Sequence, residues 1–310
     1  MRSSSSPAGP RISAGHRNLL LVAAVFAALL VTMGAVVCAT ESGEACPDWP
    51  GCFGKAIPPP EIHAIIEYTH RVIAALTTPL IVAAAVVGWR RARGLRLASW
   101  LPMVAVLFAL AAGAFGALTV LTGLPRGWAA VDLGSALIVV TLMVAAATAA
   151  WARYADPGTP DRLSTRSSLA RLAAATLGAV YAVYVGGVLV AGDGSMTRCL
   201  SWPIWRVLPD DLGGWPQVAR LTVAAIAALL VLTLVVSGLR QRGNRGVCRA
   251  TFIAAIAFFV EMLVGAIMMS RGASPLLAVV YVAAAVLLWC MLVLIGVAAG
   301  LAAAGRSSAT

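Results

Sequence analysis

The chain has 310 residues, of which 61% are hydrophobic and only 11% are charged, and its mean hydropathy is +0.91. A soluble domain of this length needs more polar surface, so the composition excludes an ordinary soluble globular protein and predicts an integral membrane protein. The net charge of +11 does not indicate nucleic-acid binding. The basic residues of the chain are concentrated in alternate connections between apolar segments, which is typical of membrane proteins whose cytoplasmic loops are positively charged.

Eight apolar segments are each long enough to cross a bilayer. In chain order they cover residues 19–40, 62–88, 100–121, 128–152, 168–191, 216–239, 250–270 and 274–300. The first segment follows Arg17 as a signal peptide would, but it is longer than a typical signal core and seven more segments follow it. We therefore interpret it as a helix and predict an all-α polytopic membrane protein with eight transmembrane helices.

The distribution of arginine predicts the orientation of these helices. Arginine is concentrated before the first segment and after the second, fourth and sixth: Arg2, Arg11, Arg17, Arg90, Arg91, Arg93, Arg96, Arg153, Arg162, Arg166, Arg171, Arg240, Arg242, Arg245 and Arg249. The other connections hold fewer basic residues, diluted by Asp and Glu. The positive-inside rule then places both termini in the cytoplasm. We expect a multi-pass protein of the cell membrane rather than of the mitochondrial inner membrane.

A short phrase occurs twice, as Cys-Pro-Asp-Trp-Pro at residues 46–50 and as Cys-Leu-Ser-Trp-Pro at residues 199–203. Gly-Ala pairs at residues 116–117 and 265–266 repeat with an offset of 149 residues, close to the offset of 153 for the phrase. Because each half has four segments, we predict two parallel four-helix repeats. The predicted organisation comprises a cytoplasmic tail (1–18), a first half (19–152), a cytoplasmic linker (153–167), a second half (168–300) and a tail (301–310).

Two cysteines, Cys46 and Cys52, flank Pro and Gly residues in the first predicted outer loop. Thiols outside the cytoplasm can oxidise, and Pro and Gly supply the turn that brings such a pair together. A disulfide is the favoured interpretation. A free thiol pair that reacts with an external redox partner and a metal site with few further ligands are the alternatives.

The strongest group of ionisable residues lies in the second segment: His63, Glu67, His70 and Arg71. Spacings of four and three place the first three on one helix face, and charges within a membrane helix are costly unless they face a site. His70 can ligate a haem iron, Arg71 can meet a propionate, and Glu67 can orient the imidazole or accept a proton. A polar clasp between helices is the structural alternative for the group, and an interfacial position is the alternative for His63.

Two further acidic residues lie within predicted helices. Asp132, near the outer end of the fourth segment, can face His70 or Arg71 across the bundle, and a salt bridge with Arg71 is its non-catalytic alternative. Glu261, in the middle of the seventh segment, needs a partner such as Arg220 or a water-filled pocket.

The chain resembles the haem A synthase family (the CtaA/Cox15 proteins) in two motifs: the paired cysteines of residues 46–52 and the following Glu67-Tyr-Thr-His70-Arg71. The eight apolar segments extend this resemblance over nearly the whole chain. The resemblance implies oxidation of the C8 methyl group of haem O to the formyl group of haem A, for cytochrome oxidase. It implies haem O or haem A bound at the iron ligand His70, Glu67 as the catalytic residue, and Arg71 and Arg220 as propionate contacts. The implied partners are haem O synthase, the oxidase assembly machinery and membrane lipid, and a homo-oligomer stays open.

The chain departs from the family pattern of four haem-ligating histidines, one in each even-numbered helix. His70 fills the first position, whereas the repeat aligns the other three with Asp132, Ala219 and Tyr281. Ala219 cannot bind iron, so the sequence excludes a bis-histidine haem b in the second half. Tyr281 can in principle ligate ferric haem, with plain packing as the alternative. We therefore expect a haem A synthase-like protein, with a non-catalytic haem-binding or oxidase-assembly protein of the same fold as the alternative.

Overall fold

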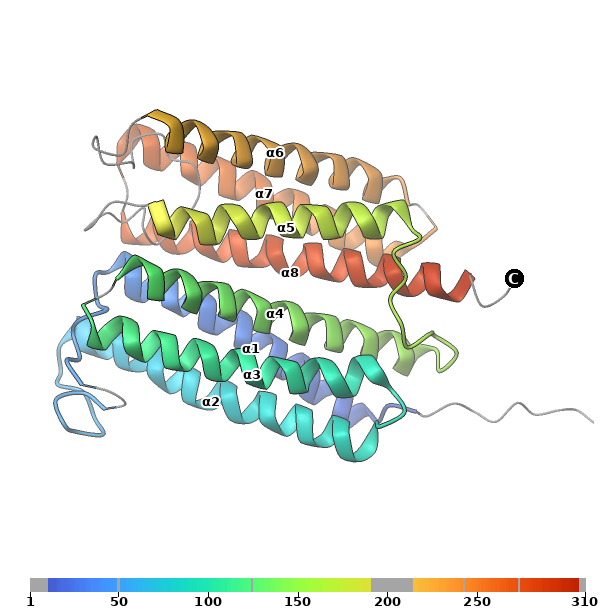
Figure 1. The fold of residues 1–310 in the computed structure, drawn as a ribbon, viewed down its shortest axis with the longest axis horizontal. Helices are drawn as coiled ribbons and strands as arrows, with labels where there is room; N and C mark the ends of the chain where they lie inside the picture. Colours follow the sequence, from blue (N-terminus) through green and yellow to red (C-terminus); the bar gives the residue numbers. More distant parts are fainter. Residues whose placement is uncertain are drawn as a thin grey trace, which may run out of the picture.

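The computed structural model describes residues 11–48, 51–123, 125–190, 214–241, 243–272 and 274–306. Over these residues the chain forms eight helices and no strand (Figure 1). The helices are α1 (Ala14–Ala39), α2 (Ile62–Arg91), α3 (Arg96–Leu121), α4 (Arg126–Ala155), α5 (Ser168–Val190), α6 (Gly214–Leu239), α7 (Arg245–Arg271) and α8 (Pro275–Arg306). Each is long and apolar enough to cross a membrane, which confirms the predicted fold class.

The helices extend beyond the apolar segments, mainly at the end of the bundle that carries the arginines. The eighth helix continues to Arg306, past the predicted boundary at residue 300, and the seventh begins at Arg245 rather than at residue 250. Adding one more residue to an existing helix gains a backbone hydrogen bond without a new nucleation cost. Long arginine side chains can also place their charge in the headgroup layer while the helix continues. Hydropathy alone therefore underestimates the length of these helices.

The helices form two sets of four. In one set α1 contacts α2 and α4, while α3 contacts α2 and α4; in the other α5 contacts α6 and α8, while α7 contacts α6 and α8. Each set is therefore a ring with the same order of neighbours, and the two parallel repeats stay a prediction. The two sets meet through α1 and α4 on one side and α5 and α8 on the other (Figure 1). The copy of the repeated phrase at residues 199–203 lies outside the described residues.

Small residues set the distance between neighbouring helices. A Cβ atom on Gly88 of α2 would lie 2.6 Å from the carbonyl oxygen of Ala98 on α3, and one on Gly238 of α6 would lie 2.4 Å from Thr251 Oγ1 on α7. Lipid gives no hydrophobic force between helices, so this close backbone approach supplies packing energy that larger residues would prevent.

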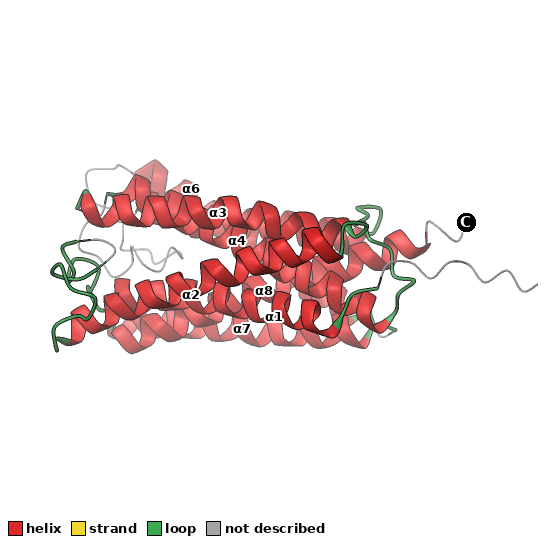
Figure 2. Ribbon diagram, turned by 90° about the horizontal axis from the view of Figure 1, so that it is seen from below, coloured by secondary structure: helices red, strands yellow, loops and turns green. Residues whose placement is uncertain are grey.

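The segment between α4 and α5 (residues 156–167, hereafter the connection) forms hydrogen bonds with both sets of helices. It lies at the end of the bundle opposite the loop between α1 and α2 (Figure 2). Asp161 accepts hydrogen bonds from the backbone N–H groups of Arg96 and Leu97, so it caps the start of α3, whose own N-cap residue makes no side-chain bond. The amide of Ser164 donates to the carbonyl of Gly300 on α8 over 3.1 Å. The connection therefore holds α3 of one set and α8 of the other.

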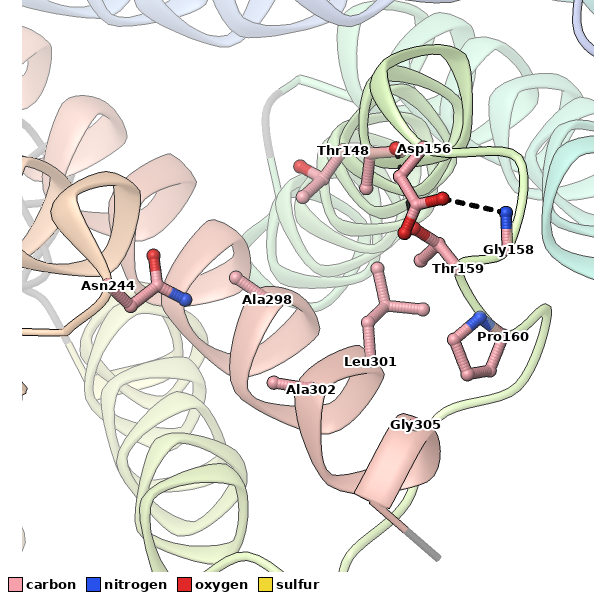
Figure 3. A pocket seen from close by; sticks show the side chains of 11 residues that line it. Thr148, Asp156, Gly158, Thr159, Pro160, Asn244, Ala298, Leu301, Ala302 and Gly305 are labelled. Carbon is pink, nitrogen blue, oxygen red and sulfur yellow. Dashed lines mark hydrogen bonds between the residues drawn. The ribbon is translucent and has the colours of Figure 1, made fainter. Parts of the chain in front are cut away.

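A cavity of about 440 Å³ lies between this connection, α4, α8 and the turn before α7 (Figure 3). Its apolar wall comes from Ala298, Leu301 and Ala302, and Asp156 and Asn244 contribute polar atoms. Both polar side chains already bond backbone amides: Asp156 that of Gly158, and Asn244 that of Val247. The cavity lies at the opposite end of the bundle from Glu67, His70 and Arg71.

Candidate functional site

The loop between α1 and α2 (residues 40–61, hereafter the disulfide loop) is closed by a bond between Cys46 and Cys52, which confirms the predicted disulfide. Both cysteines are fully buried. Asp48 shapes the turn between them, because its carboxylate accepts hydrogen bonds from the amides of Phe53 at 2.5 Å and Gly54 at 2.6 Å. The Gly54 amide is the main cause that lowers the pKa of the Asp48 carboxyl below its ordinary value.

Glu67 and Arg71 attach the disulfide loop to α2. Glu67 Oε2 accepts a hydrogen bond from the Cys46 amide over 2.8 Å, while its Oε1 pairs with Arg71. The Arg71 guanidinium also donates to the carbonyl oxygens of Cys46 at 3.1 Å, Asp48 and Gly51. These two residues therefore form a polar clasp, and it joins a helix to a loop rather than one helix to another.

His70 lies on the same helix, one turn further into the bundle than Glu67. Its Nε2 atom faces Gly34 of α1, where an added Cβ would lie only 3.4 Å away. The imidazole makes no hydrogen bond to any described residue. An unoccupied ring nitrogen beside a glycine is a position where an iron ligand can act without first breaking a protein contact.

His63 does not share this environment. It is exposed near the start of α2, where its Nδ1 atom hydrogen-bonds with Ser42 Oγ over 3.0 Å. Its contact is with the disulfide loop, which agrees with the interfacial alternative.

Asp132 is partly buried on α4, with Oδ2 facing Gly116 of α3. A Cβ atom on Gly116 would lie 3.5 Å from that oxygen. The salt bridge with Arg71, the non-catalytic alternative for Asp132, is not formed, since the ion pair of Arg71 in the described chain is with Glu67. No hydrogen bond from a described residue reaches the Asp132 carboxylate.

In the second set of helices, buried aromatic and acidic side chains occupy the positions around Gly265, the counterpart of Gly116. Tyr281 is fully buried on α8, and its ring packs where a side chain on Gly265 of α7 would lie, with Cε2 at 3.4 Å. The fully buried Glu261 accepts a hydrogen bond from the Tyr184 hydroxyl over 3.1 Å. Arg220 of α6 is near enough to Tyr281 to interact electrostatically with it. The predicted partner of Glu261, Arg220, is thus replaced by Tyr184.

These observations distinguish the two sets as sites for haem. In the first, an imidazole nitrogen without a partner faces a glycine, so the residues present fit an iron-bound porphyrin. In the second, the Tyr281 ring occupies the space beside Gly265, the counterpart of Gly116, and Ala219 on α6 has no ligating atom, so the residues present do not fit one.

Sequence reasoning missed Gly34 and Tyr184. Gly34 is the only glycine in the first apolar segment, which could have indicated a close approach to α1 at that level. Tyr184 carries no local signal of its partner, because its contact with Glu261 joins residues 77 positions apart.

Residues 17–293 match the COX15-CtaA family model, whose description is cytochrome oxidase assembly protein. Among similar proteins, the Heme A synthase of Halalkalibacterium halodurans is 28% identical over 229 residues, covering 72% of this chain and 76% of that protein. The Heme A synthase of an Exiguobacterium species is 29% identical over 246 residues (76% of this chain, 77% of that protein). That of Alkalihalophilus pseudofirmus is 31% identical over 139 residues (41% and 47%). Because the family model spans most of the sequence, this protein belongs to the COX15-CtaA family of cytochrome oxidase assembly proteins.

Proposed function

We propose that this protein acts in haem A biosynthesis and oxidises the C8 methyl group of haem O to the formyl group of haem A at the first set of helices. The observation that carries the proposal is the His70 Nε2 atom, which faces Gly34 and makes no hydrogen bond to a described residue. Family membership and the printed names of the relatives support the same substrate class.

His70 would hold the haem iron in this proposal, and the iron would supply oxidation chemistry. Conversion of the methyl group to a formyl group removes four electrons and adds one oxygen atom, so it requires an external oxidant and a source of oxygen such as O₂ or water. Glu67 lies one helical turn from His70 towards the disulfide loop, and both of its carboxylate oxygens accept hydrogen bonds. It therefore holds the disulfide loop against the start of α2. As a proton acceptor, Glu67 would use the lone pairs that these two hydrogen bonds leave free.

The propionate role proposed for Arg71 requires an exchange of partners. Its guanidinium already donates to three loop carbonyls and to Glu67, so a propionate must compete with these contacts. Arg220, in the second set of helices, is the other proposed propionate contact. For Arg71 the contacts favour anchoring of the disulfide loop, and a propionate contact would be secondary.

The alternative is a non-catalytic haem-binding protein that assists oxidase assembly. The observation in its favour is the second set of helices, where Tyr281 and Ala219 stand in place of the two aligned histidines. A protein without a second haem can still hold one haem at His70 and pass it on.

The two functions are separated by co-expression with haem O synthase in cells that lack haem A, followed by chromatography of the extracted haems. Haem A in wild-type cells and its loss in H70A support the oxidase. H63A is the matched control, because this exposed histidine of the same helix should leave haem A unchanged. If only haem O is found and the purified protein retains a Soret band, the non-catalytic function replaces the proposed one.

We further propose, from the arginine distribution, that both termini face the cytoplasm and that the disulfide loop faces outward in the cell membrane. The proposed partners are haem O synthase, as the source of substrate, and the oxidase assembly machinery, as the recipient of product. A cysteine-accessibility assay at introduced residues in the disulfide loop and in the connection after α4 tests this orientation. Labelling of the connection by an impermeant reagent in intact cells would contradict it.

A further inference from the structure

We propose that Asp132 replaces a second axial histidine, so that a haem bound at His70 has one protein ligand on its iron and an open coordination position near a carboxylate. This inference rests on the proposed function, because it requires haem at His70. It concerns the number of protein ligands on the iron and the side chain that lies beside the open coordination position.

His70 and Asp132 lie at similar depths in the bundle. The helices α2 and α4 both begin at the end of the bundle that carries the disulfide loop, at Ile62 and Arg126. With a rise of about 1.5 Å per residue, His70 lies about 12 Å and Asp132 about 9 Å from these starts. In the ring of four, α1 and α3 separate α2 from α4 on either side. His70 and Asp132 therefore come from helices across the ring, at nearly the same level.

Each of these two side chains also faces a glycine at that level. Gly34 lies five residues before the end of α1, and Gly116 lies five residues before the end of α3. Added Cβ atoms on these glycines would lie 3.4 Å from His70 Nε2 and 3.5 Å from Asp132 Oδ2. The two helices that separate α2 from α4 thus both lack a side chain where the functional groups lie.

Asp132 has no hydrogen-bond or ion-pair partner among the described residues. A carboxylate within a membrane helix is costly unless another group compensates it. Arg71 is already paired with Glu67, and no hydrogen bond from a described residue reaches the Asp132 carboxylate. A haem site with a water molecule at an open iron position supplies a donor for that carboxylate.

The chemistry of the two ligand types makes the inference measurable. Two imidazoles on ferric haem give a six-coordinate low-spin iron. One imidazole with a vacant or water-occupied position gives a high-spin iron, and a carboxylate is too weak a ligand to change this. The spin state of the bound ferric haem therefore counts the strong protein ligands.

The test uses the full-length protein purified with ferric haem and examined by optical and electron paramagnetic resonance spectroscopy. We expect a high-spin spectrum for the wild type and for D132N, and a change to low spin in D132H, where a second imidazole reaches the iron. V131H is the matched control, because the neighbouring Val131 is 42% exposed and should leave the iron high-spin.

A low-spin wild-type spectrum overturns the inference while leaving haem binding intact, and this result does not depend on how the variants fold. A high-spin spectrum in folded, haem-loaded D132H also overturns it, because Asp132 would not face the iron. If the wild type shows no Soret band, the proposed function fails as well, so the two failures are distinguishable.

Discussion

Replacement of Arg71 by methionine should release the disulfide loop from α2 without unfolding the helices. The substitution removes four donated hydrogen bonds, to the carbonyl oxygens of Cys46, Asp48 and Gly51 and to the Glu67 carboxylate. It also leaves Glu67 without its ion-pair partner.

The magnitude follows from the burial of the pair. The side chains of Arg71 and Glu67 are only 10% and 4% exposed, so solvent screens their interaction little. Removing one partner of a buried ion pair costs about 3–5 kcal/mol. Taking the lower figure of about 3 kcal/mol, loop opening should become on the order of a hundred times more frequent, since each 1.4 kcal/mol is about a factor of ten. The disulfide stays formed, so the change is confined to how the loop contacts the helix.

The assay is hydrogen exchange at the amide of Cys46, because this amide donates directly to Glu67 Oε2. We expect exchange about a hundredfold faster in R71M than in the wild type, with a smaller increase in R71K. Lysine keeps the charge but cannot supply the planar set of donors. R90M is the matched control, since Arg90 is exposed at the other end of the same helix. Unchanged exchange at Cys46 in folded R71M would refute the clasp.

Three further predictions follow from the described contacts. G34L should abolish haem binding at His70 without unfolding the protein, whereas G113L, at a glycine with no neighbour within 4 Å, should not; retained haem in G34L would contradict the site. The pKa of Asp48 is lowered in the folded loop, so its carboxylate stabilises the loop above the ordinary aspartate pKa and loses this effect as the pH falls through the lowered value. Hydrogen exchange of the loop amides should therefore accelerate more on acidification in the wild type than in D48N. An equal response to pH in both proteins would exclude stabilisation of the turn by the Asp48 carboxylate. Y184F should lower the free energy of unfolding by about 1–3 kcal/mol, measured by denaturant titration, because Glu261 loses its hydrogen-bond donor; if the effect is unchanged in an E261L background, where no acceptor is present, that bond is not its cause.

The sequence determined the number of helices, the disulfide and the family. Each of these depends on information local to a segment: a span needs one bilayer thickness of apolar residues, and Cys46 and Cys52 are separated by six positions in a turn-forming loop. Even so, the ends of α7 and α8 lay beyond the hydropathy boundaries, because backbone hydrogen bonding continues through polar residues.

Only the tertiary structure decided which partners the ionisable side chains take. Helical spacing placed Glu67, His70 and Arg71 on adjoining positions of one helix, but not whether Arg71 turns to the disulfide loop or across to Asp132. It likewise left open that Tyr184, 77 residues away, would reach Glu261. The physical reason is that hydropathy constrains a helix to the membrane but leaves its neighbours and its rotation about its own axis free. Close packing at small residues sets both, and it is a property of helix pairs rather than of any one segment.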